Sequence, residues 1–227
     1  MKDKQIQLII IFSLVACGLH ALLLNSPFSN YLYTSLFKVF IFILAPAVYL
    51  KVSKDGTLKD MLSLFSVKGN GRNMKIAFAL GASTFLVVVA GFALLLPFMD
   101  RAVVIDALAA NHITPGNIVF VFFYIVIINA ALEQFFFRGF TFMWIYKKGN
   151  KRYAHAYSSL LFSFYHIPIL FGAVSPAVLV FCTVGLIFAG LLFNEIAVRL
   201  KSIAASLVLH ISANLAISLM VGLHFIF

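Results

Sequence analysis

The sequence predicts an all-α membrane protein, a polytopic helix bundle with about seven transmembrane helices and a cytoplasmic N-terminus. Of its 227 residues, 63% are hydrophobic and 11% are charged, and the mean hydropathy is +1.06. Soluble domains contain about 45–50% apolar and about 25% charged residues. The apolar runs here are long and continuous, whereas strands of transmembrane β-barrels alternate apolar and polar residues. Helices are therefore the predicted membrane-spanning elements.

Seven apolar runs are each long enough to cross a bilayer as a helix, which takes about 20 residues. In chain order they cover residues 5–24, 31–50, 76–99, 117–146, 154–170, 175–193 and 202–222. Pro46 is expected to kink the second run, and the fourth is unusually long. We expect one integral membrane domain over residues 1–227.

The polar segments between these runs predict surface structure. In the longest, residues 51–75, apolar side chains recur at helical spacing after Thr57, which predicts a short capped amphipathic helix on the cytoplasmic surface. Residues 100–115 are predicted as a polar connection. Residues 194–201 are predicted as a short turn that contains an ordinary i,i+4 pair, Glu195 and Arg199.

The net charge of +10 reflects membrane orientation rather than affinity for nucleic acid, because the basic residues form short clusters between apolar runs. If the N-terminus is cytoplasmic, 14 of the 17 Lys and Arg residues lie on the cytoplasmic side. This distribution follows the positive-inside rule. It indicates a multi-pass protein of a cell membrane, surrounded by the lipid bilayer, with no nucleic-acid partner.

Three of the apolar runs contain strongly polar residues, which are functional candidates because charged groups are costly at membrane depth. They are Glu133, Gln134 and Arg138 in the fourth run, His166 in the fifth, and His210 with Asn214 in the seventh. At about 1.5 Å of rise per residue, Glu133, His166, His210 and Asn214 fall at similar depths. We therefore expect these four side chains to line one pocket.

Two other expectations follow from helix geometry. Gln134 and Arg138 are four residues apart and should share a helix face. Arg138 lies nearer the cytoplasm than Glu133, and a long side chain at that position can extend its guanidinium toward the aqueous surface.

The residue types in the expected pocket suit hydrolysis of an amide bond. A carboxylate beside an imidazole can take a proton from water, which assigns the role of general base to Glu133, assisted by His166. A second imidazole and an amide can donate to an oxyanion, which assigns that role to His210 and Asn214. No Ser or Cys stands in an evident nucleophile setting, so direct attack by water is favoured.

Other interpretations of the same residues remain open. Two His and one Glu are a common catalytic zinc set, but there is no H-E-x-x-H motif and Asn is a poor ligand, so we expect no metal or other cofactor. His166, His210 and Asn214 can also serve only as interhelical hydrogen-bonding residues. A transporter is disfavoured because no inverted repeat is evident.

Three short motifs carry a family resemblance: Glu133-Gln-Phe-Phe-Phe-Arg138, then Phe162-x-x-x-His166, then His210-x-x-x-Asn214. They resemble the ordered motifs of the CPBP intramembrane proteases, the family of type II CAAX prenyl endopeptidases and bacterial bacteriocin-processing and immunity (Abi) proteins. The resemblance covers roughly residues 117–222, the motif-bearing core.

The resemblance implies a glutamate-type intramembrane endopeptidase that acts on a peptide or membrane-anchored protein, in the plasma membrane of a bacterium. It implies that Glu133 and His166 activate water and that His210 and Asn214 stabilise the oxyanion. Gln134, Arg138 and Phe162 would support them.

One residue departs from the family pattern, which begins Glu-Glu-x-x-x-Arg. The second Glu is Gln134 here, so Arg138 loses its carboxylate partner one turn back. Two outcomes are open: a hydrogen-bonded Gln134–Arg138 pair preserves activity, or activity is weak or absent. In the second case the protein would act as a peptide-immunity protein or a membrane scaffold. The sequence does not predict the oligomeric state.

Overall fold

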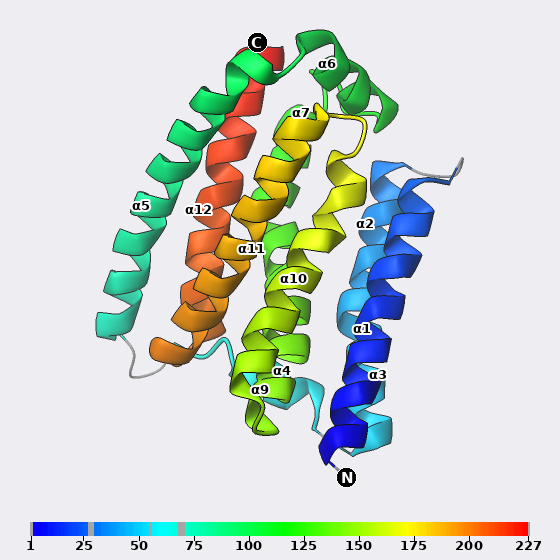
Figure 1. Ribbon diagram of the computed structural model, residues 1–227, viewed down its shortest axis with the longest axis vertical. Helices are drawn as coiled ribbons and strands as arrows, with labels where there is room; N and C mark the ends of the chain where they lie inside the picture. The colour runs from blue at the N-terminus through cyan, green and yellow to red at the C-terminus, as the bar shows by residue number, and fades with distance from the viewer. Residues whose placement is uncertain (1, 27–29, 55, 68–70, 227) are drawn as a thin grey trace.

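The computed structural model describes residues 2–26, 30–54, 56–67 and 71–226, and within these ranges the chain is helical without β-strands. The long helices run side by side, and the chain begins at one end of the bundle and finishes at the other (Figure 1). The predicted all-α bundle is confirmed.

The helices that precede the motif-bearing core are α1 (Lys2–Leu24), α2 (Tyr31–Val39), η1 (Phe40–Leu44), α3 (Ala45–Ser53), α4 (Leu58–Ser63), α5 (Gly71–Leu95), η2 (Leu96–Phe98) and α6 (Arg101–Ala110). Those of the core are α7 (Ile118–Phe123), η3 (Tyr124–Asn129), α8 (Ala130–Glu133), η4 (Gln134–Phe142), α9 (Met143–Lys147), α10 (Lys151–Leu170), α11 (Pro176–Arg199), α12 (Ile203–Val221) and η5 (Gly222–Ile226). The segments η1, η3, η4 and η5 are π-helical, and η2 is a 3₁₀ turn.

Six helical stretches in the described ranges are long and apolar enough to cross a membrane. They are Lys4–Leu24, Tyr31–Ser53, Gly71–Phe98, Ile118–Lys147, Pro176–Arg199 and Ile203–Ile226. Helix α10 is not among them, although its 20 residues span about 30 Å and it packs along α11. The protein is thus a multi-pass membrane protein, while the number of seven crossings stays a prediction.

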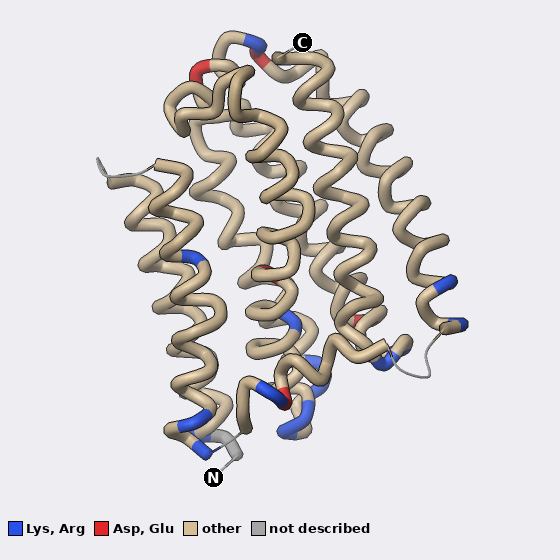
Figure 2. The backbone as a smooth tube through the Cα atoms, turned by 180° about the vertical axis from the view of Figure 1, so that it is seen from behind, with Lys and Arg blue, Asp and Glu red and all other residues tan. Residues whose placement is uncertain are grey.

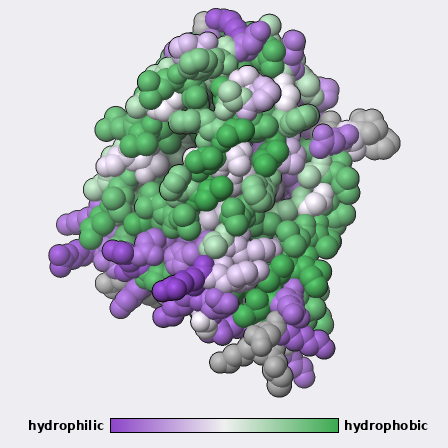
Figure 3. All heavy atoms as spheres, in the orientation of Figure 1, coloured by the Kyte–Doolittle hydropathy of each residue, from purple (hydrophilic) through white to green (hydrophobic). Residues whose placement is uncertain are grey.

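The surface has the distribution of side chains that a bilayer requires. A hydrophobic band lies between hydrophilic ends on the face shown in Figure 3, and residues such as Phe120, Val52 and Phe171 are more than 70% exposed. Lys and Arg gather at the end of the bundle where the chain begins (Figure 2). This agrees with the charge distribution that predicts a cytoplasmic N-terminus, and the orientation itself stays a prediction.

Pro46 affects the second long helix through its missing backbone donor. The π-helical segment η1 ends at Leu44, two residues before Pro46, and the Ala45 N–H donates to the carbonyl of Phe40, five residues back. Because Pro46 cannot donate to the preceding turn, a local widening of the helix is expected here.

The short helix predicted after Thr57 is present as α4. The Thr57 hydroxyl accepts from the Asp60 N–H at 3.2 Å, and the Thr57 N–H donates to Asp60 Oδ2 at 2.8 Å, which completes a capping box. The hydrogen bonds from Thr57 also hold the pKa of the Asp60 carboxyl below its ordinary value. The Ile203 N–H donates to the carbonyl of Leu64 at 2.9 Å, so α4 is attached to the start of α12.

The predicted connection at 100–115 contains a helix, α6, whose first turn Asp100 caps by accepting from the Ala102 N–H at 2.8 Å.

One predicted element was wrong. The turn predicted at 194–201 is instead the last part of α11, which continues to Arg199. Asn194 is fully buried there, and its amide donates to Ser159 Oγ at 3.2 Å on α10. A buried polar residue was therefore mistaken for a helix end.

Aromatic packing places the motif-bearing segment η4 at the centre of the bundle. Phe136, Phe137 and Phe140 are fully buried, and the ring of Phe136 stacks on that of Phe42 at 4.2 Å between centroids. The run 135–137 is therefore buried in the core and serves as a packing element. At Gly190 a Cβ would lie 2.9 Å from Ser159 Cα, so glycine permits the close approach of α11 to α10.

Candidate active site

Glu133 is the centre of the polar cluster in the bundle. Its carboxylate is 1% exposed, and Oε2 lies 3.7 Å from Nε2 of His166 on α10 and 3.6 Å from Nε2 of His210 on α12. The three sequence motifs therefore meet at one carboxylate oxygen. This convergence agrees with the expectation, based on helix rise, that these residues share one depth. Their catalytic roles stay predictions.

The backbone around Glu133 is unusual, because the α-helical turn that carries it lies between two π-helical segments, η3 and η4. In a π-helix the backbone hydrogen bonds connect residues five apart rather than four. The spacing that places side chains on one face is therefore different here from that of an α-helix. Such segments are frequent at functional sites.

His166 has a defined hydrogen-bonding state. Its Nδ1 lies 2.7 Å from the carbonyl oxygen of Phe162, one turn earlier on α10. A carbonyl only accepts, so Nδ1 carries a proton, and Nε2 is the ring nitrogen that faces Glu133. Phe162 thus supports the site through its carbonyl as well as through its ring, which packs edge-on to the imidazole at 4.6 Å.

Asn214 lies one turn beyond His210 on α12 and contacts the helix that carries Glu133. Its Nδ2 donates to the carbonyl oxygen of Ile125, in η3, at 2.9 Å. The structure thus places Asn214 between the two helices, and the oxyanion role expected for it stays a prediction.

Lys38 and Asn129 belong to the cluster, although neither was identified as a site residue from the sequence. Lys38 Nζ is 2.6 Å from Asn129 Oδ1 and 3.5 Å from Glu133 Oε1, and Asn129 Nδ2 donates to the same Oε1 at 2.9 Å. Lys38 is only 8% exposed. An ionisable residue inside a predicted span was the signal that could have identified it.

The prediction that Arg138 extends its guanidinium toward the aqueous surface was wrong. Its side chain is fully buried and does not extend to the aqueous surface. The guanidinium carbon lies 4.1 Å from the ring centroid of Phe162 and 5.0 Å from that of Phe193. None of its three nitrogens has a hydrogen-bond partner among the described residues. Aromatic faces therefore surround this cation, and such contacts are worth about 2 kcal/mol or more when desolvated.

The hydrogen-bonded Gln134–Arg138 pair is likewise absent from the described residues. Gln134 turns toward α12, where its Nε2 lies 3.2 Å from Nδ1 of His210 and its Oε1 accepts from Ser206 Oγ at 3.1 Å. The side chains of Gln134 and Arg138 thus contact different partners, although the two residues are four apart in η4.

No group of three or more His, Cys, Asp or Glu side chains in the described ranges has the geometry of a metal site. The expectation that the protein uses no metal stays a prediction.

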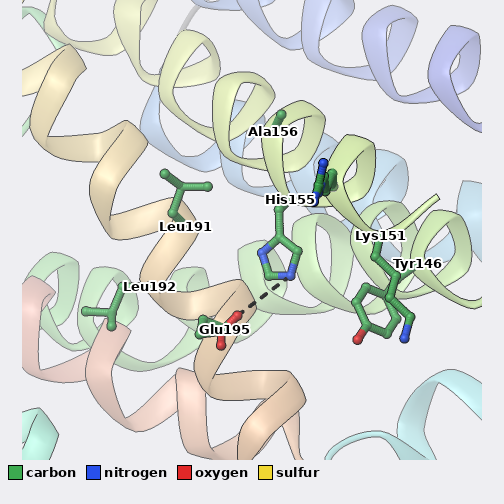
Figure 4. Close-up of a pocket in the computed structure, with 8 residues that line it drawn as sticks. Tyr146, Lys151, His155, Ala156, Leu191, Leu192 and Glu195 are labelled. Atoms are coloured by element: carbon green, nitrogen blue, oxygen red, sulfur yellow. Dashed lines mark ion pairs between the residues drawn. The ribbon is translucent and has the colours of Figure 1, made fainter.

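A surface hollow of about 670 Å³ lies away from this cluster, between α10 and α11 (Figure 4). His155 Nε2 lies 3.8 Å from Glu195 Oε2 across it, and the remaining lining residues are Tyr146, Lys151, Arg152, Ala156, Leu191 and Leu192. None of these residues contacts Glu133 in the described structure. The hollow is therefore distinct from the candidate active site.

Comparison with known proteins places the core in a family. The family model described as type II CAAX prenyl endopeptidase Rce1-like matches residues 115–216. No curated protein and no solved structure matches the chain. The matched segment contains all three motifs that converge at Glu133. The match confirms the resemblance seen in those motifs: residues 115–216 carry the family pattern of the Rce1-like type II CAAX prenyl endopeptidases, a family of membrane proteases.

Proposed function

We propose that the protein is an intramembrane endopeptidase that hydrolyses a peptide bond in a membrane-associated peptide or protein, with water activated by Glu133 and His166. The observation that carries the proposal is the approach of two imidazole Nε2 atoms to Glu133 Oε2 inside an apolar bundle. The family match supports it, because the matched family is a protease family and proteases act on peptides or proteins.

The distances exclude direct pairing of these groups. Separations of 3.6 and 3.7 Å exceed those of direct hydrogen bonds, which are about 2.7–3.2 Å. In the proposal a water lies beside the three atoms, rather than between them, and binds to all of them. In the proposed reaction this water gives a proton to Glu133 Oε2 and donates its second hydrogen to His166 Nε2. Its oxygen attacks the carbonyl carbon of the scissile bond.

The attack turns the carbonyl oxygen into an oxyanion, which His210 Nε2–H and Asn214 would stabilise by donating hydrogen bonds. When the C–N bond breaks, the proton held by Glu133 passes to the leaving amine. The products are a carboxylic acid and an amine, Glu133 is again a carboxylate, and no cofactor takes part in this scheme.

The two carboxylate oxygens of Glu133 have separate surroundings, which supports a role as base. Oε1 is held by the Asn129 amide and lies beside the Lys38 ammonium, whereas Oε2 has no hydrogen-bond partner among the described residues. Fixing one oxygen orients the other toward the two histidines. A base needs this kind of orientation relative to the proton that it takes.

A second candidate function is that of a catalytically weak or inactive family member that serves as a peptide-immunity protein or membrane scaffold. Gln134 at the position of the second family Glu favours it, as does the lack of a hydrogen-bonded carboxylate for Arg138 among the described residues. The two functions differ in their dependence on Glu133, because a scaffold does not need its carboxylate.

The experiment compares host membranes and secreted fractions from cells with the wild type and with Glu133→Ala, at matched expression, by terminal-peptide mass spectrometry. The peptidase predicts a set of new peptide termini that disappears in the variant and names the substrate. If the termini match while deletion of the whole protein still has a phenotype, the scaffold function holds instead.

A further inference from the structure

We propose that Gln134 selects the tautomer of His210: its amide donates to Nδ1, so that the ring carries its proton on Nε2, the nitrogen that faces Glu133. Gln134 is therefore a positioning residue that acts through His210. The departure from the family pattern at residue 134 then has a defined chemical consequence.

Gln134 and His210 are two buried residues whose side chains are in contact. Gln134 is fully buried and His210 is 4% exposed, and Gln134 Nε2 lies 3.2 Å from His210 Nδ1. One residue belongs to η4 and the other to α12, so the contact joins the helix of the proposed base to that of the proposed oxyanion donor. Burial makes each group depend on the other, because an unpaired polar atom is costly there.

Ser206 determines which end of the Gln134 amide faces the imidazole. The backbone carbonyl oxygen of Ser206 lies 3.5 Å from Gln134 Nε2, and a carbonyl can only accept. Turning the amide over would place Oε1 against this carbonyl, which leaves two acceptors together. The Ser206 hydroxyl has one hydrogen within reach of both Gln134 Oε1, at 3.1 Å, and the carbonyl oxygen of Ile203, at 2.9 Å, so it does not fix the amide. The backbone carbonyl of Ser206 fixes it, with the NH₂ end facing that carbonyl and His210.

The tautomer follows from this orientation. A ring nitrogen that accepts a hydrogen bond has no proton of its own, so the neutral His210 carries its proton on Nε2. A doubly protonated ring would bring Nδ1–H against the amide N–H of Gln134, two donors face to face. The Nε2–H group points toward Glu133 Oε2, an acceptor, at 3.6 Å.

The two histidines of the cluster are thus held in opposite states. His166 is protonated on Nδ1 by its contact with the Phe162 carbonyl and offers a lone pair at Nε2. His210 offers a hydrogen at Nε2. One acceptor and one donor therefore face the same carboxylate oxygen. For the hydrolysis proposed above, on which this consequence rests, the acceptor suits the attacking water and the donor suits the oxyanion.

A glutamate at position 134 would change the state of Nδ1. A carboxylate only accepts, so Nδ1 of His210 would carry a proton, whether or not Nε2 keeps its own. Gln134→Glu is therefore expected to change the protonation of Nδ1.

The test is nitrogen-15 NMR of histidine side chains in the full-length protein, labelled at histidine and purified into lipid nanodiscs. Six histidines give a tractable spectrum, and the His210 signals are those lost in His210→Gln. In the wild type we expect His210 to be protonated on Nε2 and His166 on Nδ1. In Gln134→Glu the His210 proton should appear on Nδ1, while His166 keeps its wild-type state.

A matched variant, Ser206→Ala, removes the hydroxyl and keeps the backbone carbonyl that orients the amide. We expect it to leave the His210 tautomer unchanged. A wild-type His210 with its proton on Nδ1 overturns the proposal, and so does a Gln134→Glu spectrum identical to the wild type. The measurement does not depend on cleavage. An inactive protein with the expected tautomer would therefore overturn the proposed function alone.

Discussion

Lys38 and Glu133 form an ion pair inside the bundle, with Lys38 Nζ 3.5 Å from Glu133 Oε1. Helix α2 supplies the ammonium, and the helix with the first sequence motif supplies the carboxylate. Asn129 bonds to both groups, so the three side chains form one network on the side of Glu133 that faces away from the histidines. The pair therefore connects the N-terminal helices to the candidate active site.

Replacing Lys38 by Met should destabilise the protein, because Glu133 would keep its charge in the bundle without its counter-ion. Removing one partner of a buried ion pair costs about 3–5 kcal/mol. Lys38→Arg retains the positive charge and should lose much less unfolding free energy than Lys38→Met. Denaturant unfolding of purified protein in detergent measures the difference, with Lys59→Met on the exposed face of α4 as the control. An unfolding free energy of Lys38→Met equal to that of the wild type would rule out this role.

Arg138→Met should leave the protein as stable as the wild type or more stable. The guanidinium is fully buried without a hydrogen-bond partner in the described ranges, so its desolvation is compensated only by aromatic contacts. Exchanging buried charges for apolar side chains of similar volume is often neutral or stabilising by about 1–4 kcal/mol. The same unfolding measurement decides this. A clear loss of stability would show that Arg138 has a partner that these contacts do not include.

The two histidines should be needed for turnover to different degrees. His166→Gln removes a group that assists proton transfer, an effect of about 10²–10⁴-fold on rate. His210→Gln removes an oxyanion donor, worth about 10²–10³-fold in kcat. His112→Gln, at an exposed position, is the control. Rates are measured on a synthetic peptide that spans a Glu133-dependent cleavage site. Wild-type rates in both variants would contradict the assigned roles.

Asn214→Ala distinguishes an oxyanion donor from a purely structural amide. Loss of a donor to the transition state lowers kcat by about 10²–10³-fold and leaves KM nearly unchanged. Loss of the bond to the Ile125 carbonyl alone would instead reduce stability and leave kcat intact. Ser212→Ala, on the same helix, is the comparison, because its hydroxyl bonds only within α12 in the described structure. Steady-state kinetics and unfolding are measured on the same samples.

A chelator should not affect cleavage, because the proposed reaction uses no metal. After prolonged exposure to a strong zinc chelator and its removal, the rate should stay within twofold of the untreated protein. A loss of activity that returns on addition of zinc would instead assign Glu133, His166 and His210 as ligands.

Much of the fold could be predicted because hydropathy and charge report on the bilayer directly. The apolar runs predict the long helices, and helix rise predicts one depth for Glu133, His166 and His210. Helix ends were less predictable. At Asn194 a polar residue pairs with another helix instead of ending its own, and only the packing of α10 on α11 shows this.

The parts of the site that could not be predicted depend on rotation and register. The position of Lys38 in a span was visible, but not the direction in which its helix face points, so its pairing with Glu133 could not be derived. Side-chain directions in η4 were not predictable either. Gln134 contacts His210 rather than Arg138, and Arg138 turns toward Phe162 and Phe193.

The most direct test of the central claim is the cleavage rate of purified protein in nanodiscs for the wild type, Glu133→Gln and Glu195→Gln. Glu195 is a second carboxylate on a long helix, but it is 42% exposed at its side chain and pairs with Arg199. Because Glu133→Gln lacks the proposed general base, it should cleave the mapped peptide about 10²–10⁴-fold more slowly than the wild type. Glu195→Gln should keep the wild-type rate. If Glu133→Gln cleaves as fast as the wild type, Glu133 is not the base and the proposed function is wrong.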